Sequence, residues 1–192
     1  LGTLGPAPRY LQADATDRAA LERAGAQVKA WHGRIHGVVH TAIDLRDKSL
    51  ANMDDARFVA GIAAQTRGSV RLAQAFAHEP LDFLLLFSSV QSYAKAAGQA
   101  NYAAGCTFLD AYAVALARRG AHPVKVMHWG WWGSVGVVAS DAYRERMAHA
   151  GIGSIEPAEG MAALETLLGG PRAQLMLLKA SQPPLGVDVS PT

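Results

Sequence analysis

The chain has 192 residues, of which 50% are hydrophobic and 18% are charged, and its formal net charge at pH 7 is +2. This length is sufficient for one domain with a buried core, and this composition is typical of an α/β protein with buried strands. Because the net charge is small and no run of Lys or Arg stands out, we expect no nucleic-acid partner.

The single cysteine, Cys106, excludes an intramolecular disulfide and favours a reducing, cytoplasmic location. We recognise no signal peptide, no lipidation motif and no apolar stretch long enough to span a bilayer, so no membrane association is expected. The chain begins with Leu1 instead of Met, which indicates a piece of a longer protein.

The first part of the sequence predicts two short strands with a helix between them. Residues 9–13 and 35–40 have the apolar character of strands. The intervening apolar residues recur every three to four positions, which predicts a helix with Thr16 as its N-cap and Gly33 at its end.

A long helix is predicted for residues 54–77, after a polar connector at 44–53. Gly61 and Gly68 interrupt its pattern. Such glycines mark either weak points of a helix or places where another backbone comes close, and the sequence leaves both interpretations open.

Polar chemistry follows the most apolar run of the chain. Residues 81–87 (LDFLLLF) have the length of a buried strand and lead directly into two hydroxyls, Ser88 and Ser89. A Gly-containing loop then leads to a helix that begins near Tyr102. Because open α/β sheets bind ligands at the carboxyl ends of their strands, Ser89 and Tyr102 are the candidate functional groups, and Ser88 is expected to be structural.

The rest of the chain continues the alternation of strands and helices. The helix from Tyr102 is expected to bury Phe108 and Leu109 and to stop at Gly120. Further predicted elements are a strand at 124–127, helices at 140–150 and 156–168, and a strand at 174–179. Together they predict a parallel sheet covered by helices on both faces, in one domain at 1–181 that a Pro-rich tail at 182–192 follows.

Histidine and tryptophan residues offer weaker signals. The spacing of the seven histidines matches no zinc-binding motif, so we expect no metal site. His40 and His128, at strand ends, are expected to be hydrogen-bonded core residues. Trp129, Trp131 and Trp132 could line a groove for an acyl or phosphopantetheine chain, or close the end of the sheet as core residues; both interpretations stay open.

Four segments carry a family resemblance, and they are IHGVVHTAI, LDFLLLFSSV, GQANYAAGCTFLDA and HWGWWGSVG. In this order and spacing, the chain resembles the ketoreductase domain of a modular polyketide synthase, a member of the short-chain dehydrogenase/reductase superfamily. It is most similar to those of synthases whose acyltransferase acts in trans. The resemblance implies a Rossmann-like fold that here lacks the first two strands and the Gly-rich turn, since no G-x-G-x-x-G occurs in the sequence.

The resemblance also implies a reaction. The family uses NADPH to reduce a β-keto group of an acyl chain held by the phosphopantetheine of an acyl carrier protein. Ser89 and Tyr102, thirteen residues apart, match the family's Ser and Tyr. Tyr102 would then protonate the developing alkoxide, and Ser89 would hydrogen-bond the same oxygen. The expected partners are the carrier protein, neighbouring synthase domains and the missing N-terminal half of the reductase.

Two departures concern catalysis. The family's Lys falls on Gln65 and its Asn falls on Cys106, so no obvious cation lowers the pKa of Tyr102. A second hypothesis is therefore a degenerate domain that does not reduce and has a structural or docking role in the synthase. Cys106 is expected to be a packed residue and not a nucleophile, because no base lies near it in sequence.

Part of a cofactor site is implied in the same way. Asp14 and Ala15 match the pair that meets the adenine in this family. His40, Thr41 and Ala42 match the segment on the nicotinamide side, where Ile43 replaces a glycine. These residues make up half of a cofactor site.

Overall fold

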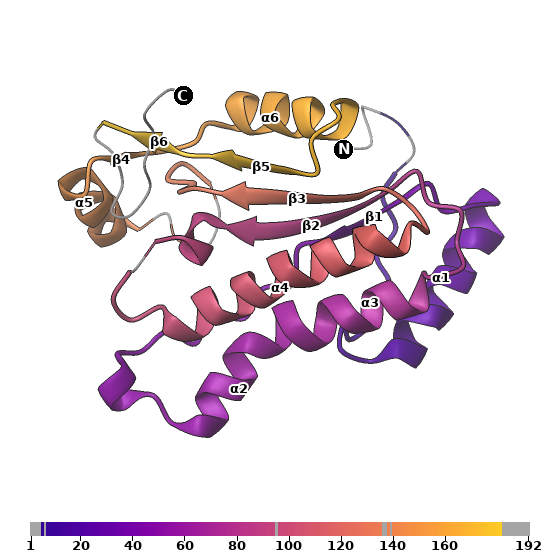
Figure 1. Ribbon diagram of the computed structural model, residues 1–192, viewed down its shortest axis with the longest axis horizontal. Coiled ribbons are helices and arrows are strands. Elements are labelled where there is room, and N and C mark those ends of the chain that lie inside the picture. Colours follow the sequence, from indigo (N-terminus) through magenta and orange to yellow (C-terminus); the bar gives the residue numbers. More distant parts are fainter. Residues whose placement is uncertain (1–4, 6, 95, 136–137, 139, 182–192) are drawn as a thin grey trace.

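A four-stranded parallel sheet lies at the centre of the chain (Figure 1). The structure is a computed structural model that describes residues 5, 7–94, 96–135, 138 and 140–181. The strand order is β1 (Gly37–His40), β2 (Phe83–Ser89), β3 (Val124–Trp129) and β5 (Gln174–Leu177), and every neighbouring pair is parallel. All four carboxyl ends therefore lie at one edge of the sheet.

Helices cover both faces of this sheet, which confirms the predicted α/β architecture. On one side lie α1 (Arg18–His32), α2 (Asp55–Ala63), α3 (Ser69–Ala75) and α4 (Ala100–Arg119), and on the other lies α6 (Pro157–Gly169). Successive strand residues alternate between the layers. Leu84 and Leu86 pack with α3 and α4, whereas Leu85 packs with α6.

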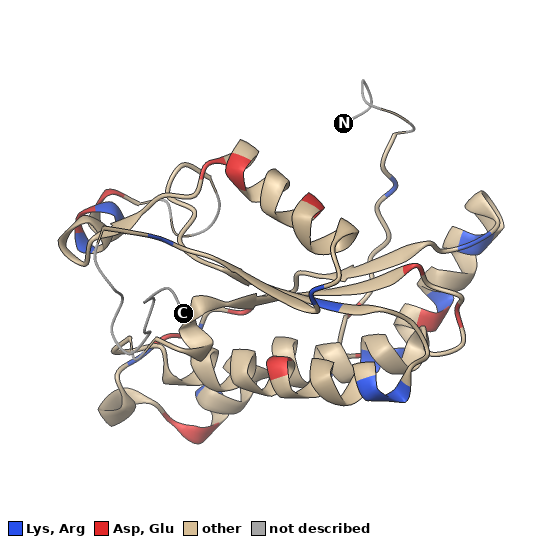
Figure 2. Cartoon of the chain, turned by 45° about the horizontal axis from the view of Figure 1, so that its top comes forward, with Lys and Arg blue, Asp and Glu red and all other residues tan. Residues whose placement is uncertain are grey.

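Acidic and basic residues are interspersed over the helices and loops (Figure 2). The four central strands contain a single Lys or Arg, Lys125, whose ammonium donates to the carbonyl oxygens of Gly170 and Arg172 beyond the sheet. The interior of the sheet is thus almost entirely uncharged, as burial on both faces requires.

A small second sheet lies beside the carboxyl edge. The helix α5 (Asp141–His149) leads into β4 (Ile152–Gly153), which pairs antiparallel with β6 (Lys179–Ala180). The predicted strand at 174–179 is therefore split into β5 and β6, which belong to different sheets. Short helical turns, η1 (Leu50–Asn52) and η3 (Val90–Ser92), complete the connections.

The prediction of a strand at residues 9–13 is wrong, because this segment has no regular structure. A strand needs a hydrogen-bonded neighbour, and no strand of the described residues pairs with this segment. The N-cap of α1 is also one residue later than predicted. Asp17, and not Thr16, accepts hydrogen bonds from the backbone N–H groups of Ala19 and Ala20.

The long predicted helix is continuous but contains a π-helical turn, η2 (Ala64–Gly68), between α2 and α3. Both glycines in it mark close approaches, although the approaching groups are side chains. A Cβ at Gly61 would lie 2.4 Å from the amide nitrogen of Asn101, and one at Gly68 would lie 3.2 Å from Nε2 of His40.

The helix α4 begins two residues before Tyr102 and ends, as predicted, at Gly120, whose φ is 68°. Leu109 is fully buried, whereas Phe108 is 39% exposed and stacks on Tyr112, so its predicted burial is wrong. Among the described residues no helix is long and apolar enough to cross a membrane.

Two of the three tryptophans belong to the core. Trp129 and Trp132 pack edge to face at 5.0 Å within the layer of α6, which favours the core interpretation for both. The indole N–H of Trp131 donates to the carbonyl of Val138 at 3.1 Å. The predicted tail at 182–192 lies outside the described residues.

Candidate active site

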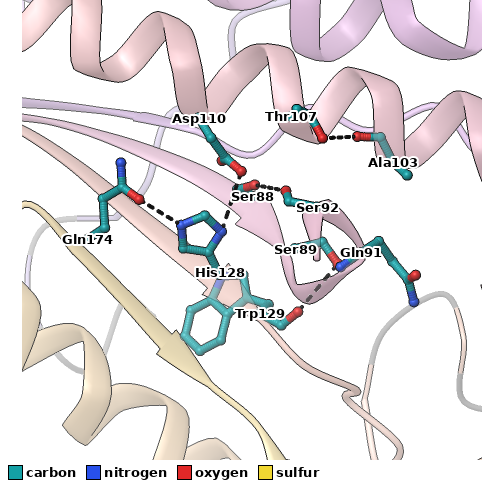
Figure 3. A network of polar contacts seen from close by, with 10 residues as sticks. All are labelled: Ser88, Ser89, Gln91, Ser92, Ala103, Thr107, Asp110, His128, Trp129 and Gln174. Atoms are coloured by element: carbon teal, nitrogen blue, oxygen red, sulfur yellow. Dashed lines mark hydrogen bonds and ion pairs between the residues drawn. The ribbon is translucent and has the colours of Figure 1, made fainter. Parts of the chain in front are cut away.

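The structure brings Ser89 and Tyr102 together at the carboxyl edge of the sheet. Ser89 is the last residue of β2 and Tyr102 lies in the first turn of α4. The two side chains lie close enough that the Ser89 hydroxyl lowers the pKa of the Tyr102 phenol. Ser89 is held by two further contacts, since its hydroxyl donates to the carbonyl of Trp129 at 3.4 Å and accepts from the backbone N–H of Gln91 at 3.2 Å (Figure 3).

The phenol of Tyr102 is a weaker acid than a tyrosine in water. Burial raises its pKa most strongly, and the neighbouring Cys106 raises it further, while the hydrogen bond with Ser89 partly offsets this. The carboxylate of Asp47, which accepts from the side-chain amide of Gln99 at 2.9 Å, acts in the same direction as burial. Tyr102 is therefore protonated at neutral pH and can donate a hydrogen bond.

Cys106 lies one helical turn beyond Tyr102 and is 1% exposed. The Tyr102 phenol and the Ser88 hydroxyl lie near its thiol and act to lower the pKa of Cys106, against the larger effect of burial. Burial raises the pKa of Cys106 to about 12, so the sulfur carries its proton at neutral pH and is a poor nucleophile.

Gln65 lies in η2 and packs against α4. A Cβ at Gly105 would lie 3.2 Å from both Cβ and Oε1 of Gln65. The side chain is buried, and its Oε1 has no hydrogen-bond partner among the described residues. The position that the resemblance assigns to a lysine thus faces the turn that follows Tyr102, but it carries no charge. Lys95, a possible substitute cation in the preceding loop, lies outside the described residues.

The predicted cofactor residues line one side of the same edge. Ala15 and His40 meet beside Gly68, where an added Cβ would lie 3.9 Å and 3.2 Å from them. His40 is buried, and its Nε2 lies 3.1 Å from the carbonyl oxygen of Ala64. Burial lowers the pKa of His40, so its ring is neutral at pH 7.

The other predicted cofactor residues are accessible. Asp14 is exposed, and its carboxylate accepts from the backbone N–H and the hydroxyl of Thr16. Thr41 and Ala42 are exposed and leave β1 beside the last residues of β2, because His40 pairs with Leu86. The sequence contains no G-x-G-x-x-G motif, the Gly-rich turn that holds a pyrophosphate in dinucleotide-binding folds.

Sequence reasoning missed a buried polar network on the α4 side of this edge (Figure 3). Oδ2 of Asp110 lies 3.7 Å from Nδ1 of His128, and Nε2 of His128 lies 3.2 Å from Oε1 of Gln174. His128 is a hydrogen-bonded core residue as predicted, but Asp110 attracted no prediction. The available signal was its spacing, eight residues after Tyr102 and four after Cys106, which places all three on one face of a helix.

Metal ligands do not gather at this site. Within the ranges that the structure describes, no group of three His, Cys, Asp or Glu side chains is arranged to hold a metal ion.

Comparisons with known proteins show which family this chain matches. Residues 2–134 match the family model described as KR domain. Over 176 residues, the chain is 56% identical to the polyketide synthase PksN of Bacillus subtilis (strain 168). The alignment covers 92% of this chain but only 3% of that protein, so the chain spans a small part of this relative.

Solved structures agree with this match. The ketoreductase from the first module of phoslactomycin biosynthesis in Streptomyces sp. HK803 superposes with a TM-score of 0.81 at 28% identity, covering 89% of this chain and 40% of that chain. A short-chain dehydrogenase from Burkholderia cenocepacia J2315 in complex with NADP has a TM-score of 0.72 at 23% identity. That superposition covers 87% of this chain and 74% of that chain, and it shows that the two share a fold.

Proposed function

The chain belongs to the family of KR domains, the ketoreductase domains of polyketide synthases, and on this premise we propose that it reduces a carrier-bound β-ketoacyl group with NADPH. The substrate would be a thioester on the phosphopantetheine of an acyl carrier protein, and the product its β-hydroxyacyl form. Neighbouring domains of the same synthase would be the other partners.

The observation that carries this proposal is the contact between Ser89 and Tyr102 at the carboxyl edge of the sheet. A ketone oxygen placed there would accept a hydrogen bond from Tyr102 and, once the Ser89 hydroxyl turns away from the carbonyl of Trp129, a second one from Ser89. As negative charge develops on that oxygen, the Tyr102 proton would be transferred to it, while Ser89 would stabilise the remaining charge. NADPH, when bound, supplies the hydride.

Tyr102 can serve as the acid although its pKa is raised, because an alkoxide is a stronger base than a phenolate. The raised pKa does reduce the driving force of the transfer. Each pKa unit corresponds to about 1.36 kcal/mol. We therefore expect a slower reductase than one with a cation beside its tyrosine.

The cofactor would lie along the exposed segment after β1. His40, Thr41 and Ala42 would flank the nicotinamide, and Asp14 and Ala15 would lie toward the adenine. The short-chain dehydrogenase from Burkholderia cenocepacia J2315, which has this fold, is in complex with NADP, and this supports the choice of a nicotinamide dinucleotide phosphate.

A second candidate function is a docking or structural role in the synthase without reduction. It is favoured by Gln65 and Cys106, which place two uncharged, buried side chains where the family resemblance implies a Lys and an Asn. In that case Ser89 and Tyr102 would be remnants of an ancestral site.

The two functions differ in turnover. The test uses the protein that contains this chain together with its adjoining residues, and follows NADPH oxidation with a β-ketoacyl pantetheine thioester. Tyr102→Phe should lower the rate by about 10²- to 10⁴-fold, the usual contribution of a general acid. Tyr112→Phe, on the same helix but stacked on Phe108, is the matched control and should leave the rate unchanged. A folded protein that shows equal, background turnover with and without the Tyr102 hydroxyl would favour the docking role.

A further inference from the structure

An irregular turn, η2, separates α2 from α3 where these helices run alongside α4 (Figure 1). A π-helical turn departs from the regular hydrogen-bond ladder of an α-helix, and side chains that insert into the ladder stabilise such departures. Turns of this kind occur frequently at functional sites. The groups that hold η2 in this form therefore matter for the site beside it.

Three side chains bond to backbone carbonyl groups in and beside η2. The hydroxyls of Thr66 and Ser69 donate to carbonyls of their own helix, three or four residues back along the chain. The third is His40, whose Nε2 lies 3.1 Å from the carbonyl oxygen of Ala64. Of the three, His40 alone comes from another element, since it is the last residue of β1.

The ring of His40 lies directly against η2. His40 is 2% exposed, and a Cβ at Gly68 would lie 3.2 Å from its Nε2, so a larger residue at 68 would press on the ring. The buried ring is neutral and a carbonyl oxygen only accepts hydrogen bonds, so Nε2 carries the proton and donates it to Ala64. The side chain of His40 thus serves the helix, whereas the exposed residues that follow it in the chain are open to a cofactor.

The same helix also contacts α4 on both sides of Tyr102. A Cβ at Gly61 would lie 2.4 Å from the side-chain nitrogen of Asn101, the residue before Tyr102. A Cβ at Gly105, three residues after Tyr102, would lie 3.2 Å from Oε1 of Gln65. Each helix therefore faces a buried amide side chain of the other with a glycine. Contacts this close transmit a displacement of one helix to the other, because a packed interior has little free space.

These contacts join the end of β1 to Tyr102. Ala64, which accepts the hydrogen bond of His40, directly precedes Gln65, which packs against α4. On the basis of the proposed function, we propose that His40 is a positioning residue, whose hydrogen bond to Ala64 fixes η2 and thereby the first turns of α4 that carry Tyr102. The segment beside the nicotinamide and the proton donor would then be held in one frame.

The effect of such a contact on catalysis is one of placement. A displacement of about 1 Å at a reacting group can lower a rate about 10²-fold. Because the ring of His40 faces the helix, its loss should act on kcat and leave KM for NADPH unchanged. A ring that bound the cofactor directly would have the opposite signature, a raised KM.

Turnover with a β-ketoacyl pantetheine thioester, in the protein with its adjoining residues, provides one test. His40→Met fills the space of the ring without a donor and should lower kcat about 10- to 100-fold, with KM for NADPH unchanged. His40→Gln, whose side-chain amide can donate in place of Nε2, should recover most of the rate. The matched control is His36→Met, because His36 is exposed and pairs with Asp82 at the other end of β1, and it should leave kcat unchanged.

Two kinetic results would overturn the positioning role. One is a His40→Met protein with the wild-type kcat, and the other is a loss that lies entirely in KM for NADPH. Wild-type protein without any turnover would overturn the reductase function and, with it, the catalytic role of His40.

Hydrogen exchange tests the same contact without substrate or NADPH. In His40→Met, backbone amides of η2 and of the first turns of α4 should exchange faster than in wild type, while those of α6, across the sheet, should keep their rates (Figure 1). His40→Gln should restore the protection. Unchanged exchange at the start of α4, or equally faster exchange in α6, would overturn the proposal even in an active enzyme, because the first shows no coupling and the second a general loss of stability.

Discussion

Restoring a cation at position 65 should make this site a faster reductase. Gln65→Lys places an ammonium on the turn that packs against Gly105, close to the start of α4. An opposite charge within about 4–6 Å shifts a pKa by roughly 1–3 units, which corresponds to about 1.4–4 kcal/mol in favour of the tyrosinate form. Because only part of this energy is expressed in the transition state, we expect kcat to rise by about 10-fold.

The pH dependence of kcat gives the sharper readout. Tyr102 must be protonated to act as the acid, so activity is present below its pKa and is lost as the pH rises through it. In wild type, burial raises this pKa, and activity should persist to high pH. In Gln65→Lys the loss should move to lower pH while the plateau rises.

The control is Gln65→Met, which replaces the glutamine by a side chain of similar length and, unlike lysine, adds no charge, so it should leave the pH profile in place. Burying an ammonium at a position that is almost fully enclosed will also lower stability by a few kcal/mol, so the melting temperature and NADPH binding are measured in parallel. A folded Lys variant that binds NADPH but keeps the wild-type plateau and the wild-type alkaline limb would refute the reasoning.

Three further predictions concern stability. Leu109→Ala should lower the free energy of unfolding, measured by urea denaturation, by about 2–5 kcal/mol, because this side chain is fully buried between α4 and the sheet. A loss below about 1 kcal/mol would contradict that packing. Gly160→Ala should lower the free energy of unfolding by about 1–3 kcal/mol, because the added Cβ would lie 2.2 Å from the ring of Trp132. The control is Gly169→Ala, which should leave the free energy of unfolding unchanged because no atom lies within 4 Å of the added Cβ. Equal losses in the two variants would contradict the contact with Trp132. Because burial lowers the pKa of His40, the unfolded chain binds a proton at His40 more readily than the folded chain does. Stability should therefore fall as the pH drops below about 6.5. If His40→Gln loses stability just as steeply over this pH range, the pH dependence comes from other groups.

Elements with a strong local signal could be predicted from the sequence. An unbroken apolar run predicts the strand β2. The spacing of apolar residues and Gly120 at the end predict the helix α4. The strand predicted at residues 9–13 failed because a strand depends on a neighbour that local sequence does not reveal. The π-helical turn at Ala64–Gly68 likewise follows from packing against α4 and has no signature of its own in sequence.

The candidate site divides in the same way. Ser89 and Tyr102 could be predicted as site residues from their positions at a strand end and a helix start, and the family resemblance then implied their roles. The pairing of Asp110 with His128 could not be predicted from the sequence, because it joins α4 to β3 across 18 residues of chain and depends on the register of β3 against β2. Tertiary contacts of this kind become visible only once the sheet order is known.

The outer edge of β1 has a practical consequence. The sheet order begins with β1, and among the described residues nothing pairs with its free side, where Val39 is 46% exposed. Unpaired backbone donors and acceptors beside an exposed valine invite a strand from another molecule. Preparations of this segment alone should therefore self-associate at high concentration, and a short peptide strand that caps β1 should keep them monodisperse.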